Sequence, residues 1–276
     1  MSGRLKFESF RTEVGTPQIR LLGQMEIVDA VGFRVTLQLQ CRKVLALLTV
    51  AAGRPLTTEQ LVRRVWGDDA PLRAAQMVRS HLRVLRGAFG GDALFDRISA
   101  GYRIVPERCR VDAWMFRALL AEARQRLPDD AMGAIRAAEA ALALWRDTDA
   151  MPDVVDVLVL RAEAAYLEEL RCQAEETLGQ AWLSSGRADL ALPRLRSLVE
   201  LHPERERFWL QLMVAEALSG RLVEAAGGTF RRARHHLVEE TGLQSAGLEA
   251  LQRALLDERA PEQLLALIAL SNSAHA

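Results

Sequence analysis

Residues 71–89 read PLRAAQMVRSHLRVLRGAF and have the pattern of a two-faced helix. At about 100° per residue, one side of this helix is an apolar stripe roughly 80° wide. The adjacent sector is polar and contains four arginines and no glutamate. The stripe comprises Ala75, Val78, Leu82, Leu85 and Phe89, and the polar sector comprises Arg73, Gln76, Arg79, Ser80, Arg83 and Arg86. The pattern predicts a helix that packs on a small core with one side and presents guanidinium groups to a partner with the other.

Two shorter helices are predicted before it. Apolar residues recur at helical spacing over 37–48, and Gly53 with the following proline ends that helix. Thr57 and Gln60 have the spacing of a capping box, so the second helix begins there and ends at Gly67. A short acidic loop then leads into the third helix, with its proline expected in the first helical turn. This loop consists of Gly67, Asp68, Asp69, Ala70 and Pro71.

Alternating apolar residues flank the three helices and predict short strands. Such alternation occurs in several short pieces between residues 19 and 37. After the third helix, Ile98, a turn at Ala100–Gly101, and Tyr102 followed by Ile104 predict a hairpin. Strands, three helices and a hairpin follow one another in the order of a winged helix-turn-helix, a fold that places one helix in the major groove of DNA.

The chain from Val111 onward is predicted to be entirely α-helical. Helical spacing continues with short breaks over 111–127, 130–146, 153–185, 187–201, 205–219, 221–239 and 244–257. Within this region Gly186-Arg187 and Gly220-Arg221 lie 34 residues apart, which is the period of tetratricopeptide repeats. The same separation relates Leu178 to Leu212, Ala181 to Ala215, and Ala191 to Ala225. The fold class is therefore mainly α with a small β component: a winged helix-turn-helix followed by tetratricopeptide-like helices.

Net charge is zero, but its distribution is uneven. Residues 19–110 contain 15 basic and 8 acidic side chains, whereas residues 111–276 contain 18 basic and 26 acidic ones. A basic first half indicates a domain that binds a polyanion, joined to a domain with another task. Arginine can read guanine edges and neutralise phosphates, so double-stranded DNA is the expected partner.

Three groups of residues are candidates for DNA contact, each with an ordinary alternative. The polar sector of the third helix could be only a solvated face, but its single sign of charge favours DNA. Arg103 in the hairpin is expected to reach the minor groove or its phosphates, and a cross-strand surface charge is equally compatible. Arg42 and Lys43 at a helix start could contact phosphate or form a simple exposed pair.

The sequence gives little support for an enzyme, a metal site or a membrane span. It has no glycine-rich phosphate loop, no Gly-x-Ser-x-Gly and no Cys-x-x-Cys. His235 and His236 are adjacent on a predicted helix, point about 100° apart, and are expected to be surface residues. The three cysteines are expected to be free thiols, and a cytoplasmic protein without cofactor or metal is expected.

Several segments resemble one family of regulators. They are CRKVLALLTVAAGRPLTTEQLVRRVWGDDAP (41–71), MVRSHLRVLRGAF (77–89), GYRIV (101–105), VDAWMFRALL (111–120), ALALW (141–145), LHPERERFWLQLMVAEALSGRLVEA (201–225) and RRARHHLVEETGL (231–243). Their order resembles that of the Streptomyces antibiotic regulatory proteins, with the last two segments similar to the bacterial transcriptional activation domain. The resemblance covers roughly residues 19–257.

The resemblance implies a cytoplasmic activator of a secondary-metabolite gene cluster. Such proteins bind short direct repeats beside the promoter −35 element, usually as two protomers side by side, and contact RNA polymerase including its sigma factor. By position, Arg79, Ser80, Arg83 and Arg86 take the role of the recognition helix. The loop from Gly67 to Pro71 corresponds to the polymerase-contacting loop of the related response-regulator fold.

The sequence also departs from the family pattern. The family's recognition helix commonly has Ser-Arg-Leu-Arg where this chain has Arg83-Val84-Leu85-Arg86, so its base preference is expected to differ. Adjacent glycines at 227–228 are expected to weaken their helix by roughly 1–2 kcal/mol. Large family members continue into an ATPase module, and this chain ends before one, as expected for the small form.

These observations divide the chain into four parts. We expect an amino-terminal extension (1–18), a winged DNA-binding domain (19–110), a bacterial transcriptional activation domain (111–260), and a tail or capping helix (261–276). Two alternatives remain open. The helical repeats could be the working surface of a peptide-binding adaptor, with the winged domain as a scaffold, or their concave face could sense a small molecule.

Overall fold

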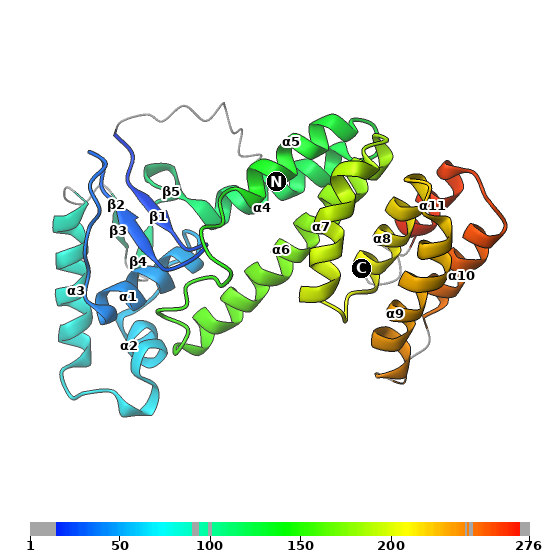
Figure 1. Ribbon diagram of the computed structural model, residues 1–276. Helices are drawn as coiled ribbons and strands as arrows, with labels where there is room; N and C mark the ends of the chain where they lie inside the picture. The colour runs from blue at the N-terminus through cyan, green and yellow to red at the C-terminus, as the bar shows by residue number, and fades with distance from the viewer. Residues whose placement is uncertain (1–14, 90–93, 99–100, 241, 243–244, 271–276) are drawn as a thin grey trace. The chain divides into compact units, whose positions relative to one another are not determined.

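A computed structural model describes residues 15–89, 94–98, 101–240, 242 and 245–270 (Figure 1). The chain forms two compact units, each with its own core. The first comprises residues 1–117 and 143–170, and the second comprises 118–142 and 171–276. The predicted domain boundary at residue 110 therefore does not separate the units, because 143–170 packs with the amino-terminal part.

A small sheet and three helices form the centre of the first unit. Strand β1 (Gln18–Arg20) pairs antiparallel with β2 (Glu26–Val28) and parallel with β5 (Arg110–Val111), in the order β2-β1-β5. The prediction that the chain contains no strand from Val111 onward was wrong at its first residue, since a two-residue strand leaves no periodic signal. Residues 33–37 form no strand, and only a single bridge joins Arg34 to Val28.

Three helices and a hairpin confirm the predicted winged helix-turn-helix (Figure 1). Both halves of the predicted capping box are present, because the Gln60 N–H donates to Thr57 Oγ1 and the Thr57 N–H donates to Gln60 Oε1. The predicted turn residue Ala100 lies outside the described residues. The elements are α1 (Leu39–Val50), α2 (Thr58–Trp66), the 3-10 turn η1 (Gly67–Asp69), α3 (Ala74–Ala88), β3 (Phe95–Ile98) and β4 (Gly101–Ile104).

Helix α3 begins three residues later than predicted. The Ala74 N–H donates to the Pro71 carbonyl at 2.8 Å, so Pro71 lies in a turn before the helix and Arg73 occupies the N-cap position. Ala74 is buried and Ala75 is exposed, the reverse of the expectation. These alanines lie at opposite edges of the apolar stripe, and only the Ala74 edge is covered. The remaining stripe residues, Val78, Leu82, Leu85 and Phe89, are buried as predicted.

The hairpin is anchored to the start of α2 by backbone hydrogen bonds. The Leu56 N–H donates to the Tyr102 carbonyl at 2.8 Å, and the Tyr102 N–H donates back to the Leu56 carbonyl at 2.9 Å. Gly101 makes this approach possible, with a φ of 135°. A Cβ atom on Gly101 would lie 2.3 Å from the Leu56 carbonyl oxygen. The wing therefore depends on glycine at this position.

Replacement of Gly101 by alanine is expected to detach the hairpin and to lower the free energy of unfolding by roughly 3 kcal/mol or more. The cause is a clash with rigid backbone together with an unfavourable φ. Urea unfolding of the full chain measures the effect. Gly87→Ala is the matched control, since a Cβ there meets nothing within 4 Å and alanine favours a helix by up to about 1 kcal/mol. Equal stability of the Gly101→Ala variant and the unmodified protein would contradict this account.

The segment 143–157 belongs to the first unit, and its two ends, 143–146 and 153–157, are not helical, although helices were predicted there. Its backbone is engaged elsewhere: the Arg146 N–H donates to the Leu22 carbonyl and the Met151 N–H to the Leu21 carbonyl, both at 3.0 Å. The predicted helix over 153–185 therefore starts only at Leu158, as α6 (Leu158–Ser184). These bonds tie the segment to the loop between β1 and β2.

The second unit is all-α and contains the predicted repeat. Gly186 (φ 73°) and Gly220 (φ 78°) both adopt the left-handed conformation that ends a helix. The same bond follows each glycine, because the Arg187 N–H donates to the Trp182 carbonyl and the Arg221 N–H to the Glu216 carbonyl, at 2.8 Å each. All six predicted repeat positions are buried: Leu178, Leu212, Ala181, Ala215, Ala191 and Ala225. The tetratricopeptide-like prediction is confirmed.

The helix predicted over 221–239 is not uniformly α-helical. Two π-helical stretches, η3 (Glu224–Thr229) and η4 (His235–Glu239), flank α9 (Phe230–Arg234), and Gly227–Gly228 lies in the first of them. The predicted capping segment forms α11 (Pro261–Leu270), whose Leu264 and Ile268 are buried in the core of this unit. The other helices are α4 (Asp112–Arg126), α5 (Ala131–Leu142), α7 (Ala188–Leu201), α8 (Glu206–Leu218) and α10 (Ala246–Leu256).

The cysteines and His235 lie as the sequence predicts, whereas His236 is only partly exposed and its ring stacks on that of buried Trp209, with the ring centroids 5.8 Å apart. Cys41, Cys109 and Cys172 are free and buried. Burial raises the pKa of Cys41 to about 11 and that of Cys109 to about 12, with a further contribution from nearby Glu107 at the latter. His235 is exposed and bonds to Glu239, which raises its pKa. No helix among the described residues has the length and the apolar character that a membrane crossing requires.

Candidate DNA-binding surface

Helix α3 exposes a row of polar side chains on the side opposite its buried stripe. Arg73 at the N-cap and Gln76, Arg79, Ser80 and Arg83 within the helix are all exposed. We call these five residues the α3 surface. The helix lies along one side of the first unit, with α1 and α2 behind it (Figure 1). The packing of α3 on α1 and α2 thus orients the row outward.

The arginines of the α3 surface are not paired within the part of the chain that the structure describes. No carboxylate of the described residues lies within ion-pair distance of Arg73, Arg79 or Arg83. A solvated face typically balances its charges, as Arg126 does with Glu122 and Asp130 in α4. Three unbalanced guanidinium groups on one exposed helix provide the charge that a polyanion would complement.

Arg86, the remaining predicted residue of this helix, is only half-exposed. Its guanidinium carbon lies 5.9 Å from the centroid of the Tyr102 ring in the wing. Arg97 in β3 lies 6.0 Å from the same ring and is exposed. The Tyr102 ring therefore contacts the cations of both helix and wing. Arg97 was not among the predicted contact residues, although extending the strand pattern backward from Ile98 would have placed it on the hairpin.

Arg103, the predicted wing contact, takes part in a cross-strand ion pair. Its guanidinium nitrogen lies 3.0 Å from the carboxylate of Asp96, the residue opposite it in the hairpin. The Asp96 carboxylate also forms an ion pair with the guanidinium of Arg108, at 3.6 Å. Arg103 is therefore a cross-strand surface charge, which was the alternative to a DNA contact. A contact between Arg103 and a DNA groove stays a prediction. It would require the Arg103 guanidinium to bind DNA while it is still paired with Asp96, or to leave Asp96.

Arg42 and Lys43 face carboxylates within the first unit. Arg42 pairs with Asp153, and Lys43 pairs with Asp156 while its own side chain is only 5% exposed. Asp153 also accepts a hydrogen bond from the Met25 N–H at 2.9 Å. Neither cation is available to phosphate in this arrangement, so neither belongs to the proposed surface. The sequence could not show these pairs because their partners lie more than a hundred residues away.

The loop between α2 and α3 is fully exposed. Each of its residues from 67 to 71 is exposed, and the following Leu72 projects its whole side chain into solvent. Asp68 and Asp69 form the 3-10 turn η1 and have no ion-pair partner among the described residues. An acidic turn beside an exposed leucine is a surface that a protein partner could contact.

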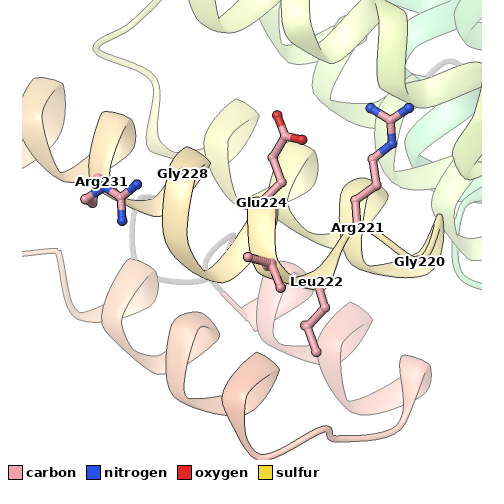
Figure 2. A pocket seen from close by; sticks show the side chains of 7 residues that line it. Gly220, Arg221, Leu222, Glu224, Gly228 and Arg231 are labelled. Carbon is pink, nitrogen blue, oxygen red and sulfur yellow. The ribbon is translucent and has the colours of Figure 1, made fainter.

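Among the described residues, the second unit has a shallow depression that bears on the ligand-sensing alternative. Figure 2 shows Arg221 and Arg231 at its opposite ends, with Glu224 between them. A single segment supplies the whole lining, whereas ligand pockets normally bring together groups from several elements. The depression therefore does not favour the ligand-sensing alternative. Its lining residues are Gly220, Arg221, Leu222, Val223, Glu224, Gly228 and Arg231.

Comparison with known proteins matches both parts of this architecture. A family model described as "Bacterial transcriptional activator domain" matches residues 111–256, and one described as "Transcriptional regulatory protein, C terminal" matches residues 32–103. Regulatory protein DnrI of Streptomyces peucetius is 31% identical over 252 residues, which cover 87% of this chain and 92% of DnrI. The chain belongs to the Streptomyces antibiotic regulatory protein family of transcriptional activators.

A second relative and a solved structure are also similar to this chain. Regulatory protein AfsR of Streptomyces griseus is 34% identical over 82% of this chain, which spans only 23% of AfsR. The solved structure of Mycobacterium tuberculosis EmbR in complex with a low affinity phosphopeptide has a TM-score of 0.83 and 25% identity, covering 94% of this chain and 70% of EmbR. Activators of the Streptomyces antibiotic regulatory protein family bind DNA and act on RNA polymerase. The α3 surface lies within the matched regulatory domain.

Proposed function

We propose that this regulator activates a secondary-metabolite gene cluster by binding direct repeats beside the promoter −35 element. Two protomers would bind side by side, and each would recruit RNA polymerase, including its sigma factor. The observation that carries the proposal is the α3 surface, with three unpaired arginines on an exposed helix. Family membership supports the DNA target, and the exposed acidic loop supports a protein partner.

The side chains of the α3 surface suit the major groove chemically. An α-helix fits this groove, and each base pair presents a distinct set of donors and acceptors there. Arginine pairs with two acceptors of guanine, glutamine pairs with adenine, and serine accepts either role. Arg79 and Arg83 are one turn apart, so they can reach neighbouring base pairs, while Arg73 at the helix start is placed to meet a phosphate.

Footprinting of the DNA upstream of neighbouring genes tests the binding mode. Two protected half-sites in the same orientation, with centres about 10–11 base pairs or a multiple apart, are expected for two protomers side by side on one face of the duplex. The experiment requires a stated salt concentration, because phosphate contacts make the affinity depend strongly on salt. Protection without sequence preference, or of an inverted repeat, would contradict the proposed arrangement.

Replacement of both Asp68 and Asp69 by alanine is expected to reduce transcription activation severalfold and to leave DNA affinity within about twofold. The substitutions remove two exposed charges from η1 without touching the core, and surface changes of this kind alter stability by about 0.5 kcal/mol or less. In vitro transcription and gel-shift measurements on the same template separate the two effects.

A matched variant shows whether the loop acts as a polymerase contact. Asp129 and Glu139 are exposed acidic residues of the second unit, and replacing both by alanine removes the same charge from elsewhere. This control should activate normally. Unchanged activation by the Asp68→Ala/Asp69→Ala variant, or an equal loss in both variants, would remove the loop from the proposal while leaving the α3 surface in place.

A further inference from the structure

Val84 is an exposed, large apolar residue at the margin of the polar sector of α3. Its side chain is 55% exposed, although valine is normally buried. At about 100° per residue, Val84 lies about 40° from Ser80 around the helix and one turn further along, about 120° from buried Val78 and about 100° from buried Leu85. The helix therefore presents an isopropyl group beside the polar side chains of the α3 surface.

The neighbours of Val84 make this part of the helix able to approach a base closely. Ser80 is small, and Gly87, one turn beyond, has no atom within 4 Å of the position that a Cβ would occupy. Ser80, Val84 and Gly87 thus form an uncharged strip, which we call the short-side-chain strip. Arg79 and Arg83 lie along its edge, and their longer side chains can extend past it to base edges or phosphates.

We infer that Val84 is a specificity-determining residue that contacts the C5-methyl group of a thymine in the major groove. The inference rests on the proposed function and adds the base that this position prefers. The thymine methyl is the apolar feature of the major-groove code, and small apolar side chains are its usual partners. Contact would cover both the methyl and the isopropyl group, and removing apolar surface from water is favourable.

Uracil scanning tests the inference, because uracil differs from thymine only by the missing methyl group. Each thymine of one footprinted half-site is replaced singly by deoxyuridine, and affinities are measured by gel shift at fixed salt. Since burying one methyl group is worth a factor of about four in affinity, the unmodified protein is expected to bind about three- to fivefold more weakly when one particular thymine is replaced. At that position the Val84→Ser variant should bind thymine and uracil equally.

Two further variants serve as controls for the uracil-scanning experiment. Val84→Thr retains one γ-methyl group and should keep most of the discrimination. Val31→Ser, which changes a valine that is 72% exposed but lies outside α3, should discriminate as the unmodified protein does. Because Val84 is exposed, the Val84→Ser variant should fold normally, which a thermal melt of the full chain verifies.

The outcomes separate this inference from the function on which it rests. Sequence-specific binding in which no thymine-to-uracil change matters, or one in which Val84→Ser retains the discrimination, overturns the role of Val84 and leaves the proposed function intact. Failure of the full chain to bind any upstream DNA specifically overturns the proposed function, and the role of Val84 with it.

Discussion

A variant in which Arg79 and Arg83 are both replaced by alanine is expected to bind its promoter at least about thirtyfold more weakly than the unmodified protein. Both side chains are exposed on α3 and have no carboxylate partner among the described residues. A good bidentate contact to a base discriminates by about 1–3 kcal/mol. Losing two such contacts therefore costs about 2–6 kcal/mol, which is a factor of roughly thirty to twenty thousand.

The same titration distinguishes base contacts from phosphate contacts. If Arg83 reads a base, Arg83→Ala relaxes the preference at one position of the site. If it neutralises a phosphate, the loss is uniform across sequences and the salt dependence becomes shallower by about one charge. Arg136→Ala/Arg234→Ala is the charge-matched control, since both of these arginines are exposed on helices of the second unit. Undiminished affinity in the Arg79→Ala/Arg83→Ala variant would exclude α3 as the DNA-binding element.

Replacement of Asp112 by alanine is expected to lower the free energy of unfolding by about 3–5 kcal/mol. This carboxylate at the start of α4 is 8% exposed and accepts three backbone N–H groups, from Leu21 at 2.7 Å, Leu22 at 3.1 Å and Ala113 at 2.7 Å. Alanine would leave all three donors buried without a partner. Arg146, which lies 3.7 Å from the carboxylate, would lose one of its two counter-charges and keep Glu26 at 3.3 Å.

Two variants calibrate this measurement by urea unfolding. Asp112→Asn keeps one acceptor oxygen and should lose less than the alanine variant. Asp189→Ala removes an exposed acidic residue from the first turn of α7 and should cost no more than about 1 kcal/mol. If the Asp112→Ala variant unfolds at the same urea concentration as the unmodified protein, the hydrogen bonds at Asp112 do not hold the first unit together.

The difference in stability between the unmodified protein and the Asp112→Asn variant should depend on pH in one direction. Burial raises the pKa of Asp112 above its ordinary value, although the backbone hydrogen bonds and Arg146 oppose this shift. A pKa that is higher in the folded state means that the folded state binds the proton more tightly. The stability of the unmodified protein relative to Asp112→Asn should therefore fall as pH rises from below the ordinary aspartate pKa through the raised value. A relative stability that rises over this range would contradict the shift.

The first unit is discontinuous in sequence, which affects how DNA binding should be studied. Carboxylates from 153–156 pair with Arg42 and Lys43 of α1, and the carbonyls of Leu21 and Leu22 bond to the backbone of 146–151. A fragment ending at residue 110 would leave these groups without partners. Lys43 is nearly buried, so its charge would be the most costly to leave unpaired. All the experiments described above therefore use the full chain.

Local patterns along the chain were sufficient to predict most elements. Amphipathic spacing predicted the helices, the Thr57 and Gln60 pair predicted the start of α2, and the 34-residue period predicted the repeat. Each of these features is encoded by residues within a few turns of one another or by self-similarity. The exposed arginines of α3 could be predicted for the same reason, because the angular position of a residue on a helix follows from its number alone.

Tertiary structure determined which charges are free to bind a partner. Nothing in the local sequence tells which of Arg79 and Arg42 is free to bind a partner. Arg79 has no ion-pair partner among the described residues, whereas Arg42 forms an ion pair with Asp153 from a distant segment. Likewise, the sequence predicted a helix over part of 143–157, where backbone bonds to the β1–β2 loop prevail. A local pattern fixes where a side chain points on its own element, but burial and ion pairing depend on segments that only the folded chain brings together.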